Sequence, residues 1–206
     1  MTQEHKVFIG PGMDGRTWGI KFLTRNWKEK HGLDTEVLTI IWKDDEPFEP
    51  KFLRTLDVVD AAIDQGCLVD LIGCSASGQL MLNIFAERRD KVHRVVNMGG
   101  FLRPGNEKGI RSLERRSSQS IAFKEGVYRF VDVEPTLTPE DKKKILTVRP
   151  QFGDELVPPN TVIVQGALNK TVPIGEHVLS IATTLFLYDP VILFLRGNSD
   201  SSSKSS

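Results

Sequence analysis

A serine stands where an apolar segment gives way to small residues. The segment Cys67 to Ile72 (CLVDLI) predicts a strand, and Gly73-Cys74-Ser75-Ala76-Ser77 leads from it into an expected helix over 76–88. A serine at a sharp strand-to-helix turn projects its hydroxyl above the edge of a sheet, and the helix N-terminus favours negative charge that develops beside it. The pattern predicts a nucleophile for acyl transfer at Ser75. The alternative is a serine that only caps the helix.

The five residues around Ser75 resemble the nucleophile elbow G-x-S-x-G of the α/β-hydrolase superfamily, with Ser77 in place of the final glycine. Two further segments are similar to that family. The loop Gly10-Pro11-Gly12-Met13-Asp14-Gly15 resembles its oxyanion loop, with proline where histidine is usual. The stretch 161–173 resembles its strand followed by G-x-x-D-x-x-V-P. The three partial motifs occur in the family's order.

The resemblance implies a role for each matching position. Ser75 would be the nucleophile, and the backbone N–H groups of Met13 and Ala76 would form the oxyanion hole. The triad acid falls on Asn169. An asparagine can accept a hydrogen bond from imidazole, but it cannot stabilise imidazolium by charge.

The base is the least complete part of the resemblance. The family's histidine follows the last strand, usually in a Gly-His pair, but Gly197-Asn198 follows the expected last strand over 191–195, and the final helix of the fold would be missing. Of four histidines, only His177 lies near the expected carboxyl edge of the sheet. It is the candidate base, or else a surface helix residue. A serine without a base is a poor nucleophile.

Expected elements alternate along the chain. Strands are expected over 6–9, 36–42, 67–72, 92–97, 161–165 and 191–195, and helices over 16–31, 52–65, 76–88 and 175–185. Such alternation predicts an α/β fold with a mostly parallel, doubly wound sheet of about six strands and helices on both faces. Ser75 would then lie at the carboxyl ends of the strands, where open α/β sheets bind ligands.

One segment interrupts this alternation. Residues 101–158 are polar and charged and too long for a plain connection, which predicts a lid inserted into a single domain over 1–196. The lid would close over a substrate pocket with Gly12 beside the nucleophile and Trp18 and Phe101 as apolar walls. The serine-rich stretch 197–206 is expected to be disordered.

Composition limits the binding partners and the cellular compartment that are expected for this protein. The 206 residues carry 27 basic and 27 acidic side chains, so no basic excess favours a nucleic-acid or anionic-membrane partner. No apolar run approaches the ~18 residues of a membrane span, and a cytoplasmic protein is expected. Cys67 and Cys74 are expected to be free thiols. Without a cluster of metal-ligand spacing, neither a metal nor an organic cofactor is expected. The oligomeric state stays open.

Three functions are compatible with these residues. The first is a carboxylesterase- or thioesterase-like hydrolase acting on a small acyl substrate through Ser75. The second is a non-catalytic binding protein with the same fold, suggested by Asn169 and Asn198 at the two helper positions. The third is a dinucleotide-binding domain that uses Gly10-x-Gly12-x-x-Gly15, with Asp34, Asp44 or Asp45 as the ribose acid. Against the third, the expected second strand ends at Trp42-Lys43 rather than at an acidic residue.

Overall fold

Six parallel strands form one sheet in the order β2-β1-β3-β4-β5-β6. The structure, a computed structural model, describes residues 3–106, 112–152, 154, 156–174, 176–187 and 189–197. Its strands are β1 His5–Gly10, β2 Asp34–Val37, β3 Leu68–Cys74, β4 Val92–Met98, β5 Ile145–Pro150 and β6 Leu168–Val172. The α/β class and the parallel sheet of about six strands are confirmed. Asn198 and the rest of the serine-rich tail lie outside the described residues.

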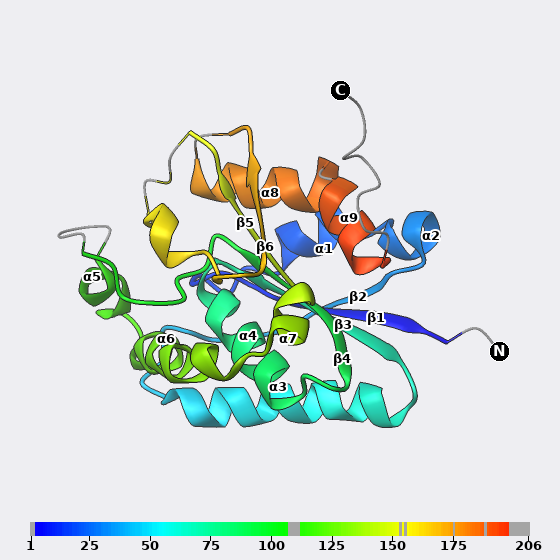
Figure 1. The fold of residues 1–206 in the computed structure, drawn as a ribbon, viewed down its shortest axis with the longest axis horizontal. Helices are drawn as coiled ribbons and strands as arrows, with labels where there is room; N and C mark the ends of the chain where they lie inside the picture. Colours follow the sequence, from blue (N-terminus) through cyan, green and yellow to red (C-terminus); the bar gives the residue numbers. More distant parts are fainter. Residues whose placement is uncertain are drawn as a thin grey trace.

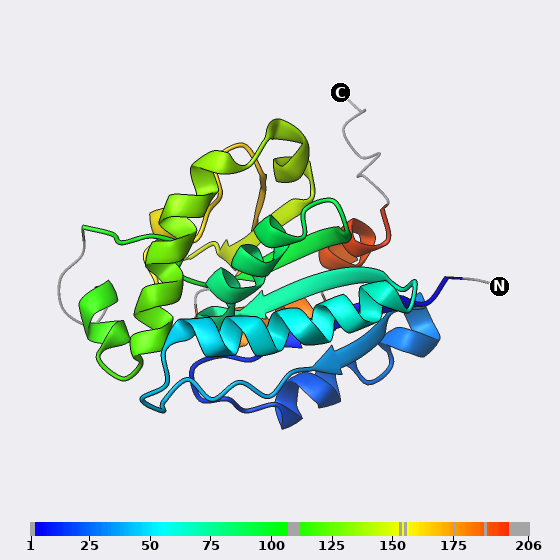
Figure 2. The same cartoon turned by 90° about the horizontal axis from the view of Figure 1, so that it is seen from below.

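Helices cover both faces of this sheet (Figure 1). α3, α4 and α6 lie on one face, and α1, α8 and α9 lie on the other; Figure 2 shows the first group in front of the strands. The bounds are α1 Trp18–Thr24, α2 Trp27–His31, η1 Ser75–Ser77, α3 Phe48–Asp64, α4 Gly78–Glu87, α5 Leu113–Ser117, α6 Ile121–Val133, η3 Glu134–Thr136, α7 Pro139–Lys143, η4 Pro159–Thr161, α8 His177–Leu187 and α9 Asp189–Leu195. None of the described helices is both long and apolar enough to cross a membrane.

The sheet separates two apolar cores. Successive side chains of a strand point to opposite faces. In β1, Phe8 belongs to the core under α3 and α4, whereas Val7 and Ile9 belong to the core under α8 and α9. All three are at most 1% exposed. Burial on both faces holds the strands in register, because a slip of one residue would exchange the two sets.

Two expected strands are not strands. Residues 161–165 contain the end of η4 and an irregular segment, in which Val162 and Val164 are buried against the α3–α4 core. Residues 191–195 belong to α9, which packs on β4 through the other core. Both expectations rested on short apolar runs, and such runs do not distinguish a buried strand from a buried helix segment or from an apolar loop.

The interrupting segment 101–158 contributes to the sheet itself. Its strand β5 pairs with β4 on one side and β6 on the other, and its helix α6 packs against α3 and α4. α7 begins as the sequence indicates, because Pro139 occupies a first-turn position and Thr138 forms a capping box with Asp141. The true fifth and sixth strands therefore lie at 145–150 and 168–172, and the helices α8 and α9 follow the last strand.

Candidate active site

Ser75 lies on a sharp turn between β3 and η1. It is the one non-glycine residue with a positive φ in the described parts of the chain, at +50°. Residues other than glycine adopt this conformation at a cost in free energy, and such strain is concentrated at functional sites. A Cβ on Gly73 would lie 2.5 Å from the carbonyl oxygen of Ser77 and 2.6 Å from Cα of Gly78. The turn is therefore tight enough to require glycine before the serine.

The side chain of Ser77 fills the space next to the end of β1. Its hydroxyl is fully buried and donates to the carbonyl oxygen of Pro11. A Cβ on Gly10 would lie 2.5 Å from Cβ and 2.7 Å from Oγ of Ser77. Serine in place of the usual elbow glycine is thus accommodated by glycine on the neighbouring strand, and its hydrogen bond ties the first loop to the elbow.

A hydrogen-bonded chain of three side chains starts at this serine. The Ser75 Oγ lies 3.0 Å from Nε2 of His177, and Nδ1 of His177 lies 2.7 Å from Oδ2 of Asp154. An imidazole that accepts the Ser75 hydroxyl proton at Nε2 carries its own proton on Nδ1, where it donates to Asp154. This is the arrangement of nucleophile, base and acid that activates a serine. The three residues follow β3, β6 and β5, so all come from the carboxyl ends of parallel strands.

The carboxylate of Asp154 is held in its charged form. Asp154 is 5% exposed, and burial raises its pKa. The hydrogen bond and charge of His177, with the backbone N–H groups of Leu156 and Val157 that donate to Oδ1 at 2.8 Å each, outweigh burial and place the pKa below its usual value. A charged acid can therefore stabilise a protonated His177.

Glycine after β4 makes room for the imidazole. Gly99 has a φ of +63°, and a Cβ there would lie 3.0 Å from Cε1 of His177. The Asn97 side chain fixes this turn, because its amide donates to the carbonyl oxygens of Gly100 and Val162 and its Oδ1 accepts from the N–H of Gly100. His177 itself is 2% exposed. These contacts hold the ring in one place beside Ser75.

Asn169 lies elsewhere. It is in β6, where its Oδ1 accepts from the hydroxyl of Thr147 and its amide donates to the carbonyl oxygens of Val164 and Ala167. The carboxylate beside His177 is that of Asp154, so the structure does not bring Asn169 into the hydrogen-bonded chain. Asn198, the expected histidine position, is outside the described residues.

Three of the expected site residues border one pocket with Ser75. Met13, Ala76 and Phe101 line a cavity of about 200 Å³ that also contains Ser75 in its wall. A Cβ on Gly12 would lie 3.6 Å from Cβ of Ser75, so the backbone of the first loop runs close to the nucleophile.

Trp18 lies apart from this cavity. It is 74% exposed, at the start of α1, and it is not among the described residues that line the pocket. Of the two expected apolar walls, the structure places only Phe101 at the pocket.

Two of the three acidic residues suggested for a dinucleotide ribose, Asp34 and Asp44, have other partners. Asp34 begins β2, at the opposite edge of the parallel sheet from the glycine loop, and contacts Lys6 and Lys28. Asp44 contacts Lys51. Asp34 is therefore too far along its strand to serve a ligand held by the loop after β1.

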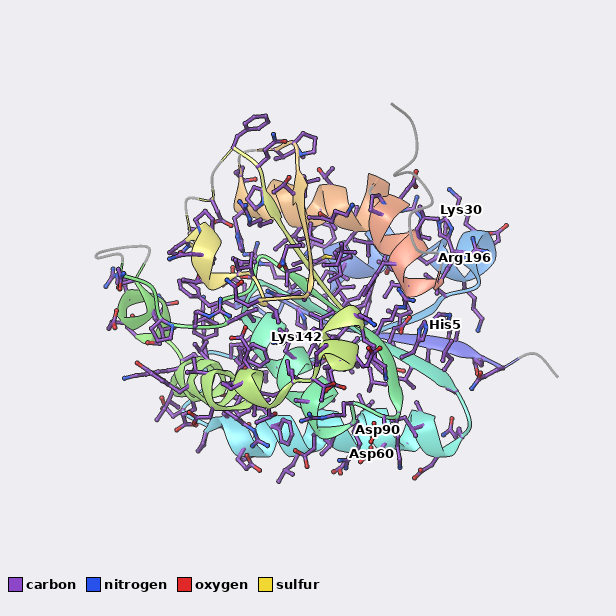
Figure 3. All side chains as sticks on the ribbon, viewed as in Figure 1. His5, Lys30, Asp60, Asp90, Lys142 and Arg196 are labelled. Carbon is purple, nitrogen blue, oxygen red and sulfur yellow. The ribbon has the colours of Figure 1, made fainter. Side chains whose placement is uncertain are left out.

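A second polar cluster lies at the amino ends of the strands. Asp70 in β3 is fully buried, and its two oxygens lie 2.6 Å from Nε2 of His5 and 2.9 Å from Nδ1 of His93. Figure 3 labels His5 on β1, near the N-terminal end of the chain. The three side chains could hold a metal ion. Nε of Arg94, however, lies 3.4 Å from Nε2 of His93. That bond makes Nε2 an acceptor and leaves the His93 proton on Nδ1 for Asp70, so the two histidines supply hydrogen-bond partners for both oxygens of a buried side chain.

Asp154 was not among the residues expected in the site. The sequence does carry a signal for it, because Asp154-Glu155-Leu156-Val157-Pro158 has the D-x-x-V-P spacing that was assigned to the later stretch ending at Val172-Pro173. His177 follows a glycine two positions earlier, at residue 175, rather than directly. With β5 and β6 in their true places, both residues follow a strand at the expected edge.

Comparison with known proteins agrees with this architecture. No family model and no curated protein matches the chain. Among solved structures, one from a study of two metagenome-derived lipolytic enzymes has a TM-score of 0.64 at 15% identity, and covers 95% of this chain and 94% of its own. A monoacylglycerol lipase of Paleococcus ferrophilus has 0.58 at 14%, with 96% of each chain covered. An alpha/beta hydrolase superfamily protein of Enterococcus faecalis has 0.54 at 15%, covering 95% and 91%. The chain thus has the α/β-hydrolase fold, and the resemblance in fold is confirmed.

Proposed function

We propose that this protein, which has the α/β-hydrolase fold, is an active serine hydrolase that transfers an acyl group from an ester or thioester to water. The observation that carries the proposal is the hydrogen-bonded chain from Ser75 through His177 to Asp154. Ser75 is the nucleophile, His177 the general base and Asp154 the acid that orients and stabilises the protonated imidazole. The chain order Ser, Asp, His is the order found in α/β hydrolases.

The reaction follows from these positions. The Ser75 Oγ attacks the carbonyl carbon while Nε2 of His177 takes the hydroxyl proton, and the resulting imidazolium is stabilised by the Asp154 carboxylate. The tetrahedral intermediate collapses when His177 gives that proton to the leaving oxygen or sulfur, which leaves an acyl ester on Ser75. A water molecule, deprotonated by His177, then attacks the acyl carbon. The acid departs, and the proton returns to Ser75.

Negative charge on the carbonyl oxygen needs donors next to the nucleophile. Met13 and Ala76 border the same pocket as Ser75, and their backbone N–H groups supply the oxyanion hole in this proposal. The bond between Ser77 and the Pro11 carbonyl supports it, because that bond fixes the loop carrying Met13 relative to the turn carrying Ala76. Preorganised donors of this kind cost no rearrangement during the reaction.

The non-catalytic alternative loses the observation on which it rested. It assumed asparagine at both helper positions, whereas His177 contacts Ser75 and Asp154 contacts His177. The dinucleotide alternative is weakened in the same way, because Gly10 packs on Ser77 and Gly12 runs beside Ser75. The glycines of the first loop have a role in building the elbow that needs no nucleotide.

A fluorophosphonate probe together with 4-nitrophenyl esters tests the proposal. The native protein should be labelled and should release 4-nitrophenol, and both activities should disappear in Ser75→Ala and fall steeply in His177→Ala. His31→Ala, at the end of α2, is a matched control that should retain both. A folded native protein that neither reacts with the probe nor cleaves any ester of the series would contradict the proposed function.

A further inference from the structure

The pocket beside Ser75 is lined mainly by apolar side chains, together with two polar ones. The apolar part consists of Met13, Phe101, Phe123, Leu156 and Val157, and the polar part of Arg115 and Gln119. Phe101 and Phe123 contact edge to face, with ring centroids 6.2 Å apart. A cavity of about 200 Å³ with such walls accepts a short carbon chain. What distinguishes it from a purely apolar pocket is the arginine.

The guanidinium of Arg115 is free to bind a ligand. Within the part of the chain that the structure describes, it makes neither a hydrogen bond nor an ion pair, and no carboxylate lines the pocket. Gln119 lies in the turn after α5 and borders the same pocket. Other arginines of the protein hold a carboxylate: Arg54, Arg88, Arg103 and Arg129.

The charge and shape of this pair select the kind of anion. A guanidinium matches a carboxylate with two parallel hydrogen bonds. A phosphate monoester carries about −1.5 to −2 charges near neutral pH, and Arg115 is the one cation among the described lining residues. A single negative charge is the better match. The amide of Gln119 can donate to the same carboxylate.

The position of His177 decides which part of the substrate enters. In the proposed reaction His177 protonates the leaving group, so the leaving group lies on the side of that ring. The described residues that line the pocket include Ser75 and the two oxyanion positions, but His177 is not among them. The pocket therefore takes the acyl part of the substrate.

Resting on the proposed hydrolase function, we infer that the substrates are esters or thioesters of short dicarboxylic acids, with the free carboxylate bound by Arg115. Apolar contacts hold the connecting carbons, and the carboxylate pairs with the Arg115 guanidinium in the wall of the same pocket. The inference concerns this chain's own pocket and names a substrate class, a monoanionic acyl group.

Two 4-nitrophenyl esters with acyl chains of equal length test it: the hexanoate and the monoester of adipic acid. The quantity measured is the ratio of kcat/KM for adipate over hexanoate, after subtraction of spontaneous hydrolysis. The expected ratio is about three in the native protein, since Arg115 is exposed and an ion pair at an exposed site contributes only a few-fold. Arg115→Gln should bring the ratio to about one or below, and Arg115→Lys should give an intermediate value.

A matched variant separates a local contact from general charge. Arg25→Gln removes the same charge from the end of α1, away from the pocket, and should keep the native ratio. A native ratio of one or less overturns the inference, and so does a high ratio that persists in Arg115→Gln. In both of these cases the protein still cleaves esters, so the proposed hydrolase function is retained. If the protein neither cleaves an ester nor reacts with the probe, the proposed function itself is overturned.

Discussion

Asp154→Asn replaces one oxygen of the hydrogen-bonded chain by an amide nitrogen, and the surroundings decide where that nitrogen goes. Oδ1 accepts from the backbone N–H groups of Leu156 and Val157, each at 2.8 Å, so the amide oxygen of the variant must stay there. The amide NH₂ then faces Nδ1 of His177, at the position where Oδ2 now accepts a bond of 2.7 Å. Two donors would meet unless the imidazole moves its proton to Nε2.

That tautomer cannot act as the base. With a proton on Nε2, His177 has no lone pair for the Ser75 hydroxyl, although every heavy atom keeps its place. The same exchange of carboxylate for amide in a serine protease triad lowers kcat by about 10⁴-fold. At about 1.36 kcal/mol for each factor of ten, this corresponds to about 5.4 kcal/mol of lost transition-state stabilisation. We expect a loss of this order in Asp154→Asn.

The assay is the steady-state rate on a 4-nitrophenyl ester, with the rate of fluorophosphonate labelling as an independent measure of Ser75 reactivity. Asn169→Ala is the control, because Asn169 occupies the position where the sequence resemblance placed the acid; its kcat should stay within about threefold of the native value. Near-ultraviolet circular dichroism checks that both variants fold. A folded Asp154→Asn protein that keeps more than a tenth of the native kcat refutes the assignment of the acid, as does an equally large loss in Asn169→Ala.

Three further outcomes follow from the packing and from the titration of buried groups. Gly10→Ala should lower the free energy of unfolding, measured in urea, by about 1–3 kcal/mol, because the new Cβ would lie 2.5 Å from the Ser77 Cβ. The loss should be smaller in a Ser77→Gly background. Equal losses in both backgrounds would show that the two sites are not coupled. Burial raises the pKa of Cys74 to about 12, so iodoacetamide at pH 8 should alkylate the partly exposed Cys67 first in the native protein. Peptide mass spectrometry measures the order of alkylation. Alkylation of Cys74 before Cys67 would argue against the burial of Cys74 in the core under α8 and α9. The folded-state pKa of Asp154 lies below its usual value, so its carboxylate stabilises the fold above about pH 4, and this contribution is lost as the pH falls through the folded-state pKa. Melting temperatures should therefore decline less steeply below pH 4 in Asp154→Asn than in the native protein. Identical slopes would contradict the lowered pKa.

The elbow could be predicted from sequence because its signals are local. An apolar strand, small residues around one serine and a following helix occupy twenty consecutive positions, and the structure places them as expected from Leu68 to Glu87. The alternation of the first three strands with helices is equally local, because each is followed by a helix with an apolar face. The bounds are less exact there: β2 is Asp34–Val37 rather than 36–42, and the expected helix 16–31 is divided into α1 and α2.

The second half could not be divided in the same way. The run 191–195 is apolar at every position and is a helix whose residues are mostly buried, whereas the strand β6 contains exposed Leu168 and Asn169 because it lies at the edge of the sheet. Periodicity therefore favoured the wrong segments. With these strands misassigned, the sequence places the acid at Asn169 rather than at Asp154. The position of His177 near the edge of the sheet does not depend on that assignment.

The separation of Ser75 and His177 along the chain, 102 residues, has a consequence for how the proposed active site assembles. The nucleophile turn can form within one strand-turn-helix unit, but the base arrives only after β5 has paired with β4 and β6 with β5. Contacts between distant residues form late, because the loop they close must first be ordered. During refolding, ester cleavage should thus return only when the whole sheet is complete. It should return later than the burial of Trp42 in the core under α3 and α4. The recovery of ester cleavage would therefore report when the last step of folding is complete.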